Sequence, residues 1–418
     1  LSKLDDQSYW ENIKNKKIII FGMGVSSLDV IEKLSNKKNK IYPISRTFLF
    51  PFARPLNQKL RRPGKLDHKS IIFTEEISLK LKKLINDKKN LNKINFNKFI
   101  YPFLKIEFYL IYFKEFLFEK DYRELLVTAN KICKNEKNFQ KLDFSILEET
   151  INNLLINFLN NKRLKKSFYK RNWFSSEEIL KNIQNKKYFF FDFFSNPLLL
   201  QKNFSKKYVN FLNWDINEAK KGNLSSPFKK ASDGLWRDLR HLITILFDDC
   251  KNLKLLNYFL NHILTVHNRM CDGPSLQSIK KIKNYILKKN IILSHKDNRN
   301  FSVFKKSLIM KTKNGKIKID YIFNAIASIY KKNYKNDDLI NNMINNKLVE
   351  INKQIRGNLV IGLKLNEKQN PVVGSKTIKK IRFVGPASEG PKFFHHTLSR
   401  PDKKQSNYTD LSDWTRSI

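Results

Sequence analysis

Short apolar runs and one helical stretch alternate over the first 45 residues of the chain. Lys16–Phe21 (KKIIIF) and Lys40–Ser45 (KIYPIS) each have the length and composition of a buried strand. The stretch between them, Ser26–Leu34, favours a helix. A strand, a helix and a second strand within about 30 residues make up a βαβ unit. The pattern therefore predicts a parallel βαβ unit over Ile18–Ser45.

Helical and irregular patterns dominate the middle of the chain. Its most apolar stretch, Phe99–Phe118, contains four charged residues, so it predicts a buried helix or a pocket wall and not a membrane span. Tyr188–Phe194 (YFFFDFF) predicts a buried strand. Ser232–Asp249 predicts an amphipathic helix, whose apolar face is formed by Leu235, Leu239, Leu242, Ile243 and Leu246.

The last third of the chain predicts mostly short strands. Ser302–Thr312 and Lys316–Asp320 favour a β-hairpin around Asn314-Gly315. The other expected elements are a helix at Leu276–Lys288 and strands at Ile291–Leu293, Tyr321–Ala325, Leu359–Leu363 and Ile381–Val384.

The net charge of +43 is high enough to suggest nucleic-acid binding. However, the lysines are spread along the whole chain and mixed with Asn and Ile, as in Lys88–Lys93 and Lys331–Asn336. No compact basic cluster interleaves with aromatic residues. This distribution indicates a compositional bias, so nucleic acid is not the partner we expect. A basic surface still favours anionic ligands.

The cysteines and the first residues indicate the setting of the protein. Cys133, Cys250 and Cys271 form no CxxC pair, which argues against a disulfide scaffold and a structural zinc site. Leu1–Asp6 has no signal-peptide pattern. We therefore expect a cytoplasmic protein without a membrane partner and without a bound metal.

A glycine motif connects the first predicted strand to the first predicted helix. Gly22-Met-Gly24-Val-Ser26-Ser27 is a variant of the GxGxxG pattern. Gly22 would allow a tight turn, Gly24 would let the backbone approach a diphosphate, and the helix start at Ser26 would supply N–H donors. Ser27 is small enough for close packing between helix and strand. The alternative is a tight turn in an unrelated α/β domain.

Ser45-Arg46 ends the second predicted strand. An acidic residue there would bind the ribose 2′-hydroxyl of NAD, whereas Ser45 with Arg46 suits the 2′-phosphate of NADP. Arg54 lies close enough in sequence to assist. A surface arginine in a basic protein is the alternative interpretation.

Two further groups of residues are candidates for a substrate or cofactor pocket. The first comprises Trp236, Arg240, Asn268 and Arg269, which could line a pocket for a flat anionic ligand; surface arginines around a packed tryptophan are the alternative. The second is the Gly- and Pro-containing loop after the last predicted strand, in which the candidates are Gly385, Pro386, Gly390, Phe394 and His395. Such a loop could close over a flavin or its substrate.

The order of these motifs resembles FAD/NAD(P)-binding oxidoreductases of the two-dinucleotide type, which are related to flavin-dependent N-hydroxylating monooxygenases. The residues that carry the resemblance are Tyr9-Trp10, Gly22, Gly24, Asp29, Ser45-Arg46, Pro51, Asp215, Glu218, Ser226-Pro227, Trp236–Arg240, Asn268-Arg269, Gly273-Pro274, Gly385-Pro386, Glu389-Gly390 and Phe393-Phe394. It covers both ends and the second half of the chain, but residues from about 60 to 205 have no counterpart.

The resemblance implies two cofactors. NADPH would bind at the turn over Gly22–Ser27, FAD would lie beside Gly385–Gly390, and hydride would pass from NADPH to the flavin. Asn324–Ala327 would return the chain to the FAD domain. The separate FAD fingerprint of the family is absent from the sequence. The resemblance therefore implies a fragment that lacks about 150 upstream residues, or a separate chain that supplies them.

The expected fold is α/β: a Rossmann-like nucleotide-binding domain with a large helical insertion and a C-terminal segment that returns to a partly missing FAD domain. The expected divisions are 1–65 for the NADPH-binding half, 66–230 for the helical substrate region, 231–315 for the rest of the central domain, and 316–418 for part of the FAD-binding domain. The expected function is an NADPH-dependent flavoprotein oxidoreductase acting on a small molecule, with monooxygenases among the implied activities. The alternatives are a flavin-free NADP-dependent dehydrogenase and a basic nucleic-acid-binding protein.

Overall fold

The structure is a computed structural model. It describes residues 7–35, 38–45, 49–56, 72–173, 190–195, 204–248, 250–271, 273–293, 301–304, 307–312, 315–325, 338–351, 362–366 and 368–383. The chain forms two compact units, and each gathers three segments of sequence. The first comprises Leu1–Gln58, Ile156–Asp233 and Thr265–Ala327, and the second comprises Lys59–Leu155, Gly234–Leu264 and Ser328–Ile418.

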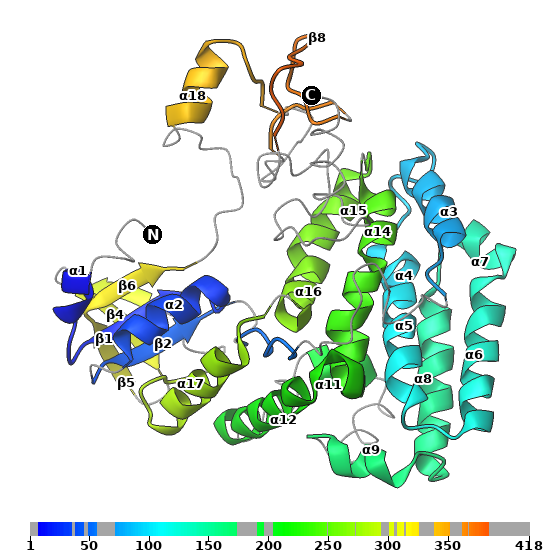
Figure 1. Cartoon of the computed structure of the whole chain (residues 1–418), viewed down its shortest axis with the longest axis horizontal. Helices are drawn as coiled ribbons and strands as arrows, with labels where there is room; N and C mark the ends of the chain where they lie inside the picture. The colour runs from blue at the N-terminus through cyan, green and yellow to red at the C-terminus, as the bar shows by residue number, and fades with distance from the viewer. Residues whose placement is uncertain are drawn as a thin grey trace. The chain divides into compact units, whose positions relative to one another are not determined.

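Three parallel strands form the main sheet of the first unit, in the order β2-β1-β6 (Figure 1). They are β1 (Lys17–Phe21), β2 (Lys40–Ile44) and β6 (Tyr321–Asn324). In their register Phe21 pairs with Ile44 on one side and with Asn324 on the other, so the three strands end at one edge. A parallel bridge between Ile41 and Ile291 extends the sheet beyond β2. The mixed α/β fold expected from the sequence is confirmed.

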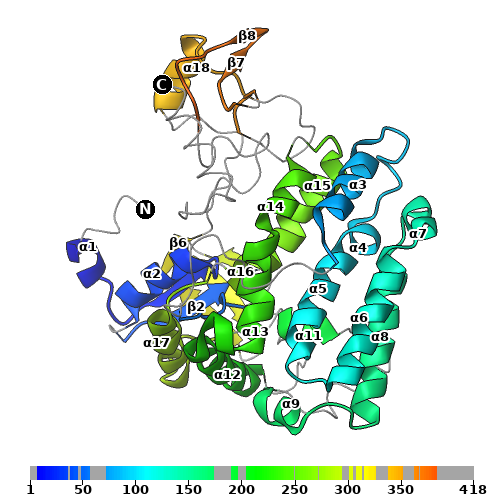
Figure 2. The same cartoon turned by 45° about the vertical axis from the view of Figure 1, so that its right-hand side comes forward.

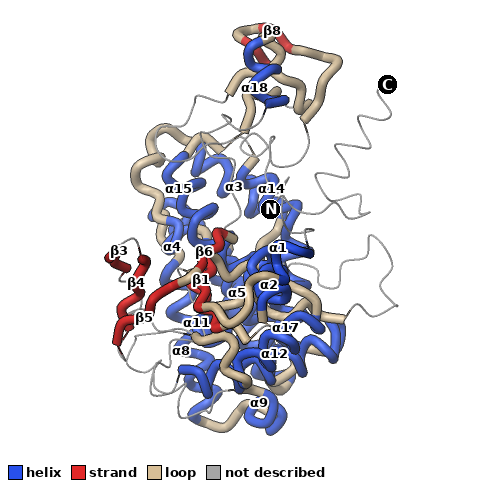
Figure 3. Tube along the Cα trace, turned by 90° about the vertical axis from the view of Figure 1, so that its left-hand side faces the viewer, coloured by secondary structure: helices blue, strands red, loops and turns tan. Residues whose placement is uncertain are grey.

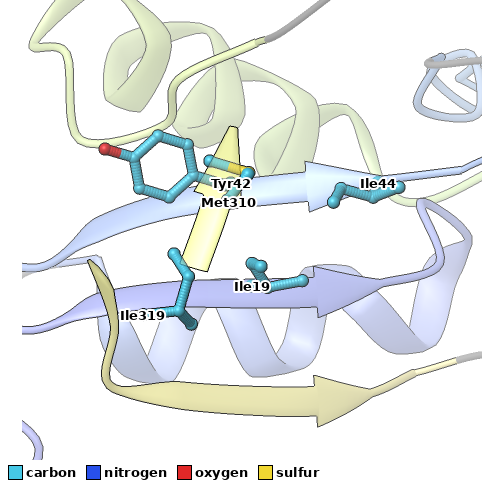
Figure 4. Packing of buried hydrophobic residues seen from close by; sticks show 5 residues of the cluster. All are labelled: Ile19, Tyr42, Ile44, Met310 and Ile319. Atoms are coloured by element: carbon cyan, nitrogen blue, oxygen red, sulfur yellow. The ribbon is translucent and has the colours of Figure 1, made fainter. Parts of the chain in front are cut away.

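An antiparallel sheet covers one face of the parallel sheet. It consists of β3 (Phe301–Phe304), β4 (Ser307–Thr312) and β5 (Gly315–Ile319), and Figure 3 shows it in red beside β1 and β6. The apolar core between the two sheets, drawn in Figure 4, consists of Ile19, Tyr42, Ile44, Met310 and Ile319. Alternate residues of β1 and β2 supply this face, namely Ile19 with Phe21 and Tyr42 with Ile44, as the period of two in a strand requires.

Helices cover the opposite face. Helix α2 (Val25–Leu34) lies against the sheet (Figure 1), and its buried face includes Leu28, Ile31 and Leu34. The short helix α1 (Gln7–Glu11) carries Trp10, which stacks on Phe323 of β6 with ring centroids 5.4 Å apart. Both faces of the strands are therefore buried, which explains the continuous apolar runs KIIIF and KIYPI.

The first unit contains further helices. Helices α12 and α17 lie side by side (Figure 2). Gly222, with φ of 79°, interrupts α12 near its C-terminal end. The helices are α9 (Lys166–Arg171), α11 (Phe190–Ser195), α12 (Phe204–Ser225), α13 (Pro227–Lys229), the π-helical turn η2 (Lys230–Gly234), α16 (Leu264–Cys271) and α17 (Leu276–Leu287).

The second unit is mainly helical, and α5, α6 and α8 run side by side in it (Figures 1 and 2). Its elements are α3 (Glu75–Asn86), α4 (Phe96–Phe99), α5 (Tyr101–Lys114), α6 (Glu119–Cys133), α7 (Glu136–Lys141), α8 (Ser145–Asn160), whose last residues join the first unit, α14 (Leu235–Phe247), α15 (Leu253–Tyr258), η3 (Phe259–Ile263), α18 (Asp338–Asn345), β7 (Val372–Val373) and β8 (Lys376–Thr377).

Helix α5 confirms the buried helix expected within Phe99–Phe118. Its charged residues either form hydrogen bonds or lie at the end of the helix. The carboxylate of Glu107 accepts hydrogen bonds from the backbone N–H groups of Ile72 and Phe73. Lys105 donates to Glu148 across 2.8 Å, and both side chains are buried. Lys114 is the last residue of the helix. The buried charges of Lys105, Glu107 and Glu148 are therefore paired or hydrogen-bonded, as burial demands.

Three predicted strands are wrong. The described part of Tyr188–Phe194 belongs to helix α11, because an apolar run without alternation does not distinguish a buried helix from a strand. Ser302–Thr312 belongs to two antiparallel strands, β3 and β4, and the sequence between them, Lys305-Lys306, contains no Gly or Asn that would have indicated the break. Ile381–Phe383 forms no strand, because Ile381 O and Phe383 N are bonded to Asn370 and Gln369 in a loop.

Of the predicted strand Ile291–Leu293, only Ile291 pairs, in the single bridge to Ile41. The remaining predicted elements with a described course agree with the structure. The helices at Ser26–Leu34, Ser232–Asp249 and Leu276–Lys288 correspond to α2, α14 and α17. Strands β4 and β5 pair as in the predicted hairpin, with Thr312 paired to Gly315, whereas Asn314 lies outside the described residues. Tyr321–Ala325 corresponds to β6. Of Leu359–Leu363 only Gly362 and Leu363 are described, and Leu363 bridges to Ile351.

Candidate functional site

The glycine motif forms the turn between β1 and α2 at the edge where the parallel strands end. Gly22 has φ of 104°, a conformation that side chains with a Cβ rarely adopt. Its N–H donates to the carbonyl of Ile44, the last residue of β2, across 2.8 Å. Gly22 is therefore required by the backbone, which it turns sharply out of the sheet and into α2.

Gly24 is the N-cap of α2 and has a different geometry. Its φ of −85° and ψ of −171° are extended values that any residue can adopt. It is exposed, and a Cβ built on it would have no atom within 4 Å. Neither the backbone nor the packing of the described residues therefore requires a glycine at this position. A glycine here keeps open a space directly in front of the helix.

The start of α2 offers hydrogen-bond donors to that space. The helix begins at Val25, so the N–H groups of Val25 and Ser26 have no acceptor within the helix. Gly24 supplies no side-chain cap, and the first turn contains no acidic residue. Unsatisfied N–H groups and the positive end of the helix dipole attract anions.

Ser27 contributes to the shape of the turn. Its side chain is fully buried, and its hydroxyl donates to the carbonyl of Gly24 across 2.6 Å. Its backbone N–H donates to the same carbonyl across 3.1 Å. The two serines of the motif therefore differ: the side chain of Ser26 is half-exposed, whereas Ser27 is buried and stabilises the turn.

The acidic residues of α2 lie beyond its first turn. Asp29 is largely exposed. The partial desolvation of its carboxyl, followed by the neighbouring negative charge of Glu32, raises its pKa. Glu32 in turn accepts a hydrogen bond from Lys281 of α17 across 2.7 Å. The side chains at the helix start itself therefore carry no negative charge.

The position of the turn in the sheet is informative. β1 is the central strand, and the chain continues from it to β2 on one side and returns as β6 on the other. Ser45 directly follows β2 and Asn324 ends β6, so both lie at the same edge as Gly22. In open α/β sheets, ligands bind at the edge where strand order reverses in this way. Of the predicted nucleotide-binding residues, the structure brings Gly22, Gly24, Ser26, Ser27 and Ser45 together.

A buried ion pair holds the chain just after this site. The ammonium of Lys229 lies 2.6 Å from Asp215 Oδ1 and 2.7 Å from the carbonyl of Ala53, and both side chains have no exposed surface. Asp215 Oδ2 accepts the N–H of Ala53 across 2.6 Å. Burial raises the pKa of Asp215, and the charge of Lys229 opposes that shift. The pair thus satisfies both backbone groups of Ala53 in place of a neighbouring strand.

Other residues hold the same segment. The N–H of Phe50 donates to the hydroxyl of buried Tyr208, and the N–H of Phe52 donates to the carbonyl of Arg269. Gly273 approaches Phe52 so closely that a Cβ would lie 1.7 Å from its carbonyl oxygen. The segment that follows β2 is therefore fixed by side chains and backbone from four separate parts of the first unit.

The predicted pocket residues are divided between the two units. Trp236 and Arg240 lie on α14 in the second unit, whereas Asn268 and Arg269 lie on α16 in the first. Trp236, Arg240 and Arg269 are buried, and a guanidinium nitrogen of Arg269 donates to the carbonyl of Ser195. Arg269 thus holds neighbouring backbone in the first unit.

Several predicted residues lie outside the described residues, so their predictions are untested. They are Arg46, Gly385, Pro386, Gly390, Phe394 and His395. Among the residues that are described, no group of His, Cys, Asp and Glu side chains could hold a metal ion.

Sequence reasoning missed the role of Lys229. The resemblance already included Asp215, Glu218 and Ser226, and all three are buried. Ser226 donates a hydrogen bond to Glu218 across 2.6 Å, and Lys229 pairs with Asp215. In a chain with 81 Lys and Arg residues, one more lysine carries no signal. Its only hint is its place among small and apolar residues in PFKKAS.

Comparison with known proteins adds no family assignment: no protein-family model matches the chain, and no curated protein sequence does. Across the part of the chain that the structure describes, none of the helices combines the length and the apolar character needed to cross a membrane.

Proposed function

We propose that the chain binds NADPH at the turn formed by Gly22–Ser26 and provides the hydride-donor site of a flavin-dependent oxidoreductase. Gly24 carries the proposal. It is a glycine that its backbone angles and neighbours do not require, at the start of a helix and at the reversal point of a parallel sheet. A diphosphate that must approach the backbone closely accounts for a glycine at such a position.

The chain's own groups would bind and orient the nucleotide. The N–H groups of Val25 and Ser26 would donate to the diphosphate, and the helix dipole would favour its charge. Ser45 at the end of β2 lies where the adenosine ribose reaches in folds of this kind. A serine followed by Arg46 favours a 2′-phosphate over a 2′-hydroxyl, so the proposed ligand is NADPH and not NADH.

The flavin part of the proposal depends on the resemblance. NADPH supplies hydride, and in such reactions the cofactors carry the chemistry while the protein binds and orients them. The residues predicted to lie beside FAD, Gly385, Pro386 and Gly390, are outside the described residues. We therefore assign no acid, base or oxygen-activating residue in this chain.

The test uses the full chain. NADPH and NADH are titrated separately and binding is followed by calorimetry. The proposal predicts one NADPH site with a Kd at least tenfold lower than that for NADH, and loss of the preference in Arg46→Ala. Absence of saturable NADPH binding would contradict the proposal.

A second measurement separates the flavin-dependent reaction from a flavin-free dehydrogenase. FAD is added to the chain under anaerobic conditions with NADPH, and the flavin absorbance is followed. The proposal predicts bleaching that the Gly24→Val variant abolishes. NADPH binding without bleaching, together with substrate-dependent NADPH oxidation in the absence of flavin, would support the dehydrogenase alternative instead.

A further inference from the structure

The first unit contains an open groove at the edge of the parallel sheet opposite the glycine turn. Its volume is about 590 Å³, within the range of roughly 300–1,000 Å³ of small-molecule sites. Lys40, the first residue of β2, lines it. The strand rises about 3.3 Å per residue, so the groove and the carboxyl edge of the sheet lie at opposite ends of β2.

The floor and one wall of the groove are apolar. Ile286 and Leu287 come from the end of α17, and Ile291 and Ile292 from the segment that bridges to β2. Leu287 is 58% exposed, although it lies among other apolar side chains. An exposed leucine that continues a buried apolar surface makes that surface suitable for an apolar ligand.

The rim of the groove is cationic. It carries Lys40, Lys206 and Lys289, all exposed, and no acidic residue is among the described residues that line it. Lys40 donates to the carbonyl of Lys289 across 2.9 Å, and among the described residues none of the three lysines forms an ion pair with a carboxylate. Elsewhere in this unit, Lys221 and Lys281 do pair with carboxylates. The rim thus concentrates uncompensated positive charge beside an apolar floor.

The first turns of α12 add to this charge. Lys206, Val209 and Asn210 line the groove from one face of the helix, at spacings of three and four residues. The helix begins at Phe204, so its positive dipole end lies on the same side. Val209 adds an apolar side chain to the lining.

We propose that this groove binds an alkyl carboxylate, with the chain on Ile286, Ile291 and Val209 and the carboxylate between Lys206 and Lys289. The occupant follows from charge complementarity: an apolar floor without cationic groups would suit a neutral ligand, and lysines without the floor would suit a small inorganic anion. The site is separate from the proposed nucleotide site and does not depend on it.

The binding test uses decanoate, with 1-decanol as the uncharged analogue and acetate as the headgroup alone. Calorimetric titration of the full chain should show saturable binding of one decanoate, at least tenfold weaker binding of decanol, and no detectable binding of acetate. Unsaturable uptake of decanoate, or equal affinity for decanol and decanoate, would overturn the proposal.

Variants locate the site. Val209→Trp should fill the groove and weaken decanoate binding at least tenfold while leaving the charge unchanged. Lys206→Glu should weaken it to a similar extent through repulsion, and tests the proposal even if Val209→Trp does not fold. The matched control is Lys318→Glu, which makes the same charge change at an exposed position of β5. An equal loss in Lys318→Glu, or no loss in Lys206→Glu, would contradict this location.

Discussion

Gly22 and Gly24 lie in the same turn, but only Gly22 is required by the fold. Gly22 has φ of 104°, whereas Gly24 has extended angles and open space where a Cβ would be. Gly22→Ala should therefore destabilise the protein by about 1–2 kcal/mol. Gly24→Ala should change stability by less than about 0.5 kcal/mol, because the entropy lost from the unfolded chain offsets the poorer N-cap. Urea unfolding of both variants measures the difference, and an equal loss in both would contradict the distinction.

We expect the effects of substituting Asp215 and Lys229 on the free energy of unfolding to be strongly coupled. Lys229→Met leaves a buried carboxylate without its cation and should cost about 3–5 kcal/mol. Asp215→Asn leaves the ammonium with only backbone partners and should also destabilise. The double variant should be far more stable than the sum of the single effects implies, because neither charge remains. A double-mutant cycle by urea unfolding checks this, and additive losses would show that the two side chains act independently.

We expect that a side chain added at Gly273 would clash with the backbone of Phe52 and destabilise the protein. Its Cβ would lie 1.7 Å from the carbonyl oxygen of Phe52, and that backbone is held by Arg269 and Pro274 on either side. Gly273→Ala should therefore destabilise at or above the upper end of the range of about 1–3 kcal/mol for overpacking. Thermal unfolding measures it, with Gly24→Ala as the matched control. A melting temperature equal to that of the control would contradict the close approach.

The carboxylate of Asp143 should make the stability of the protein depend on pH. Burial acts to raise its pKa, but hydrogen bonds from Ser145, followed by the contact with Lys98, outweigh it and lower the pKa below 3.8. A lowered pKa in the folded state gives stability that is fully present above the unfolded value and is lost as the pH falls through the folded value. Asp143→Asn should therefore be less stable than the native chain at pH 7, and the difference should shrink below about pH 4. A difference that does not depend on pH between 3 and 7 would exclude this carboxylate as its source.

The local elements of the sheet could be predicted from the sequence. The buried runs of β1 and β2, the glycine turn between β1 and α2, and the pairing of β4 with β5 each have a signal within a few residues of sequence. The candidate turn residues Gly22, Gly24, Ser26, Ser27 and Ser45 come together for the same reason, because one short βαβ unit contains them all.

Long-range relationships could not be predicted. The pairing of β6 with β1 joins residues 321 and 18, and no periodicity indicates which strand returns to the centre of a sheet. The sequence has no residue that usually marks the helix over Phe190–Ser195 or the break between β3 and β4. The role of Lys229 depends on Ala53 and Asp215, which are distant in sequence, so only the fold reveals it.

The central claim is that the open space at Gly24 serves a dinucleotide diphosphate. The most direct measurement is calorimetric titration of NADPH into the native chain, Gly24→Val and the control Lys33→Gln, which changes the far end of the same helix. The proposal predicts saturable binding to the native chain and the control, and at least tenfold weaker binding to Gly24→Val with an unchanged melting temperature. Equal NADPH affinity in Gly24→Val and the native chain, or no NADPH binding to any of the three proteins, would contradict it.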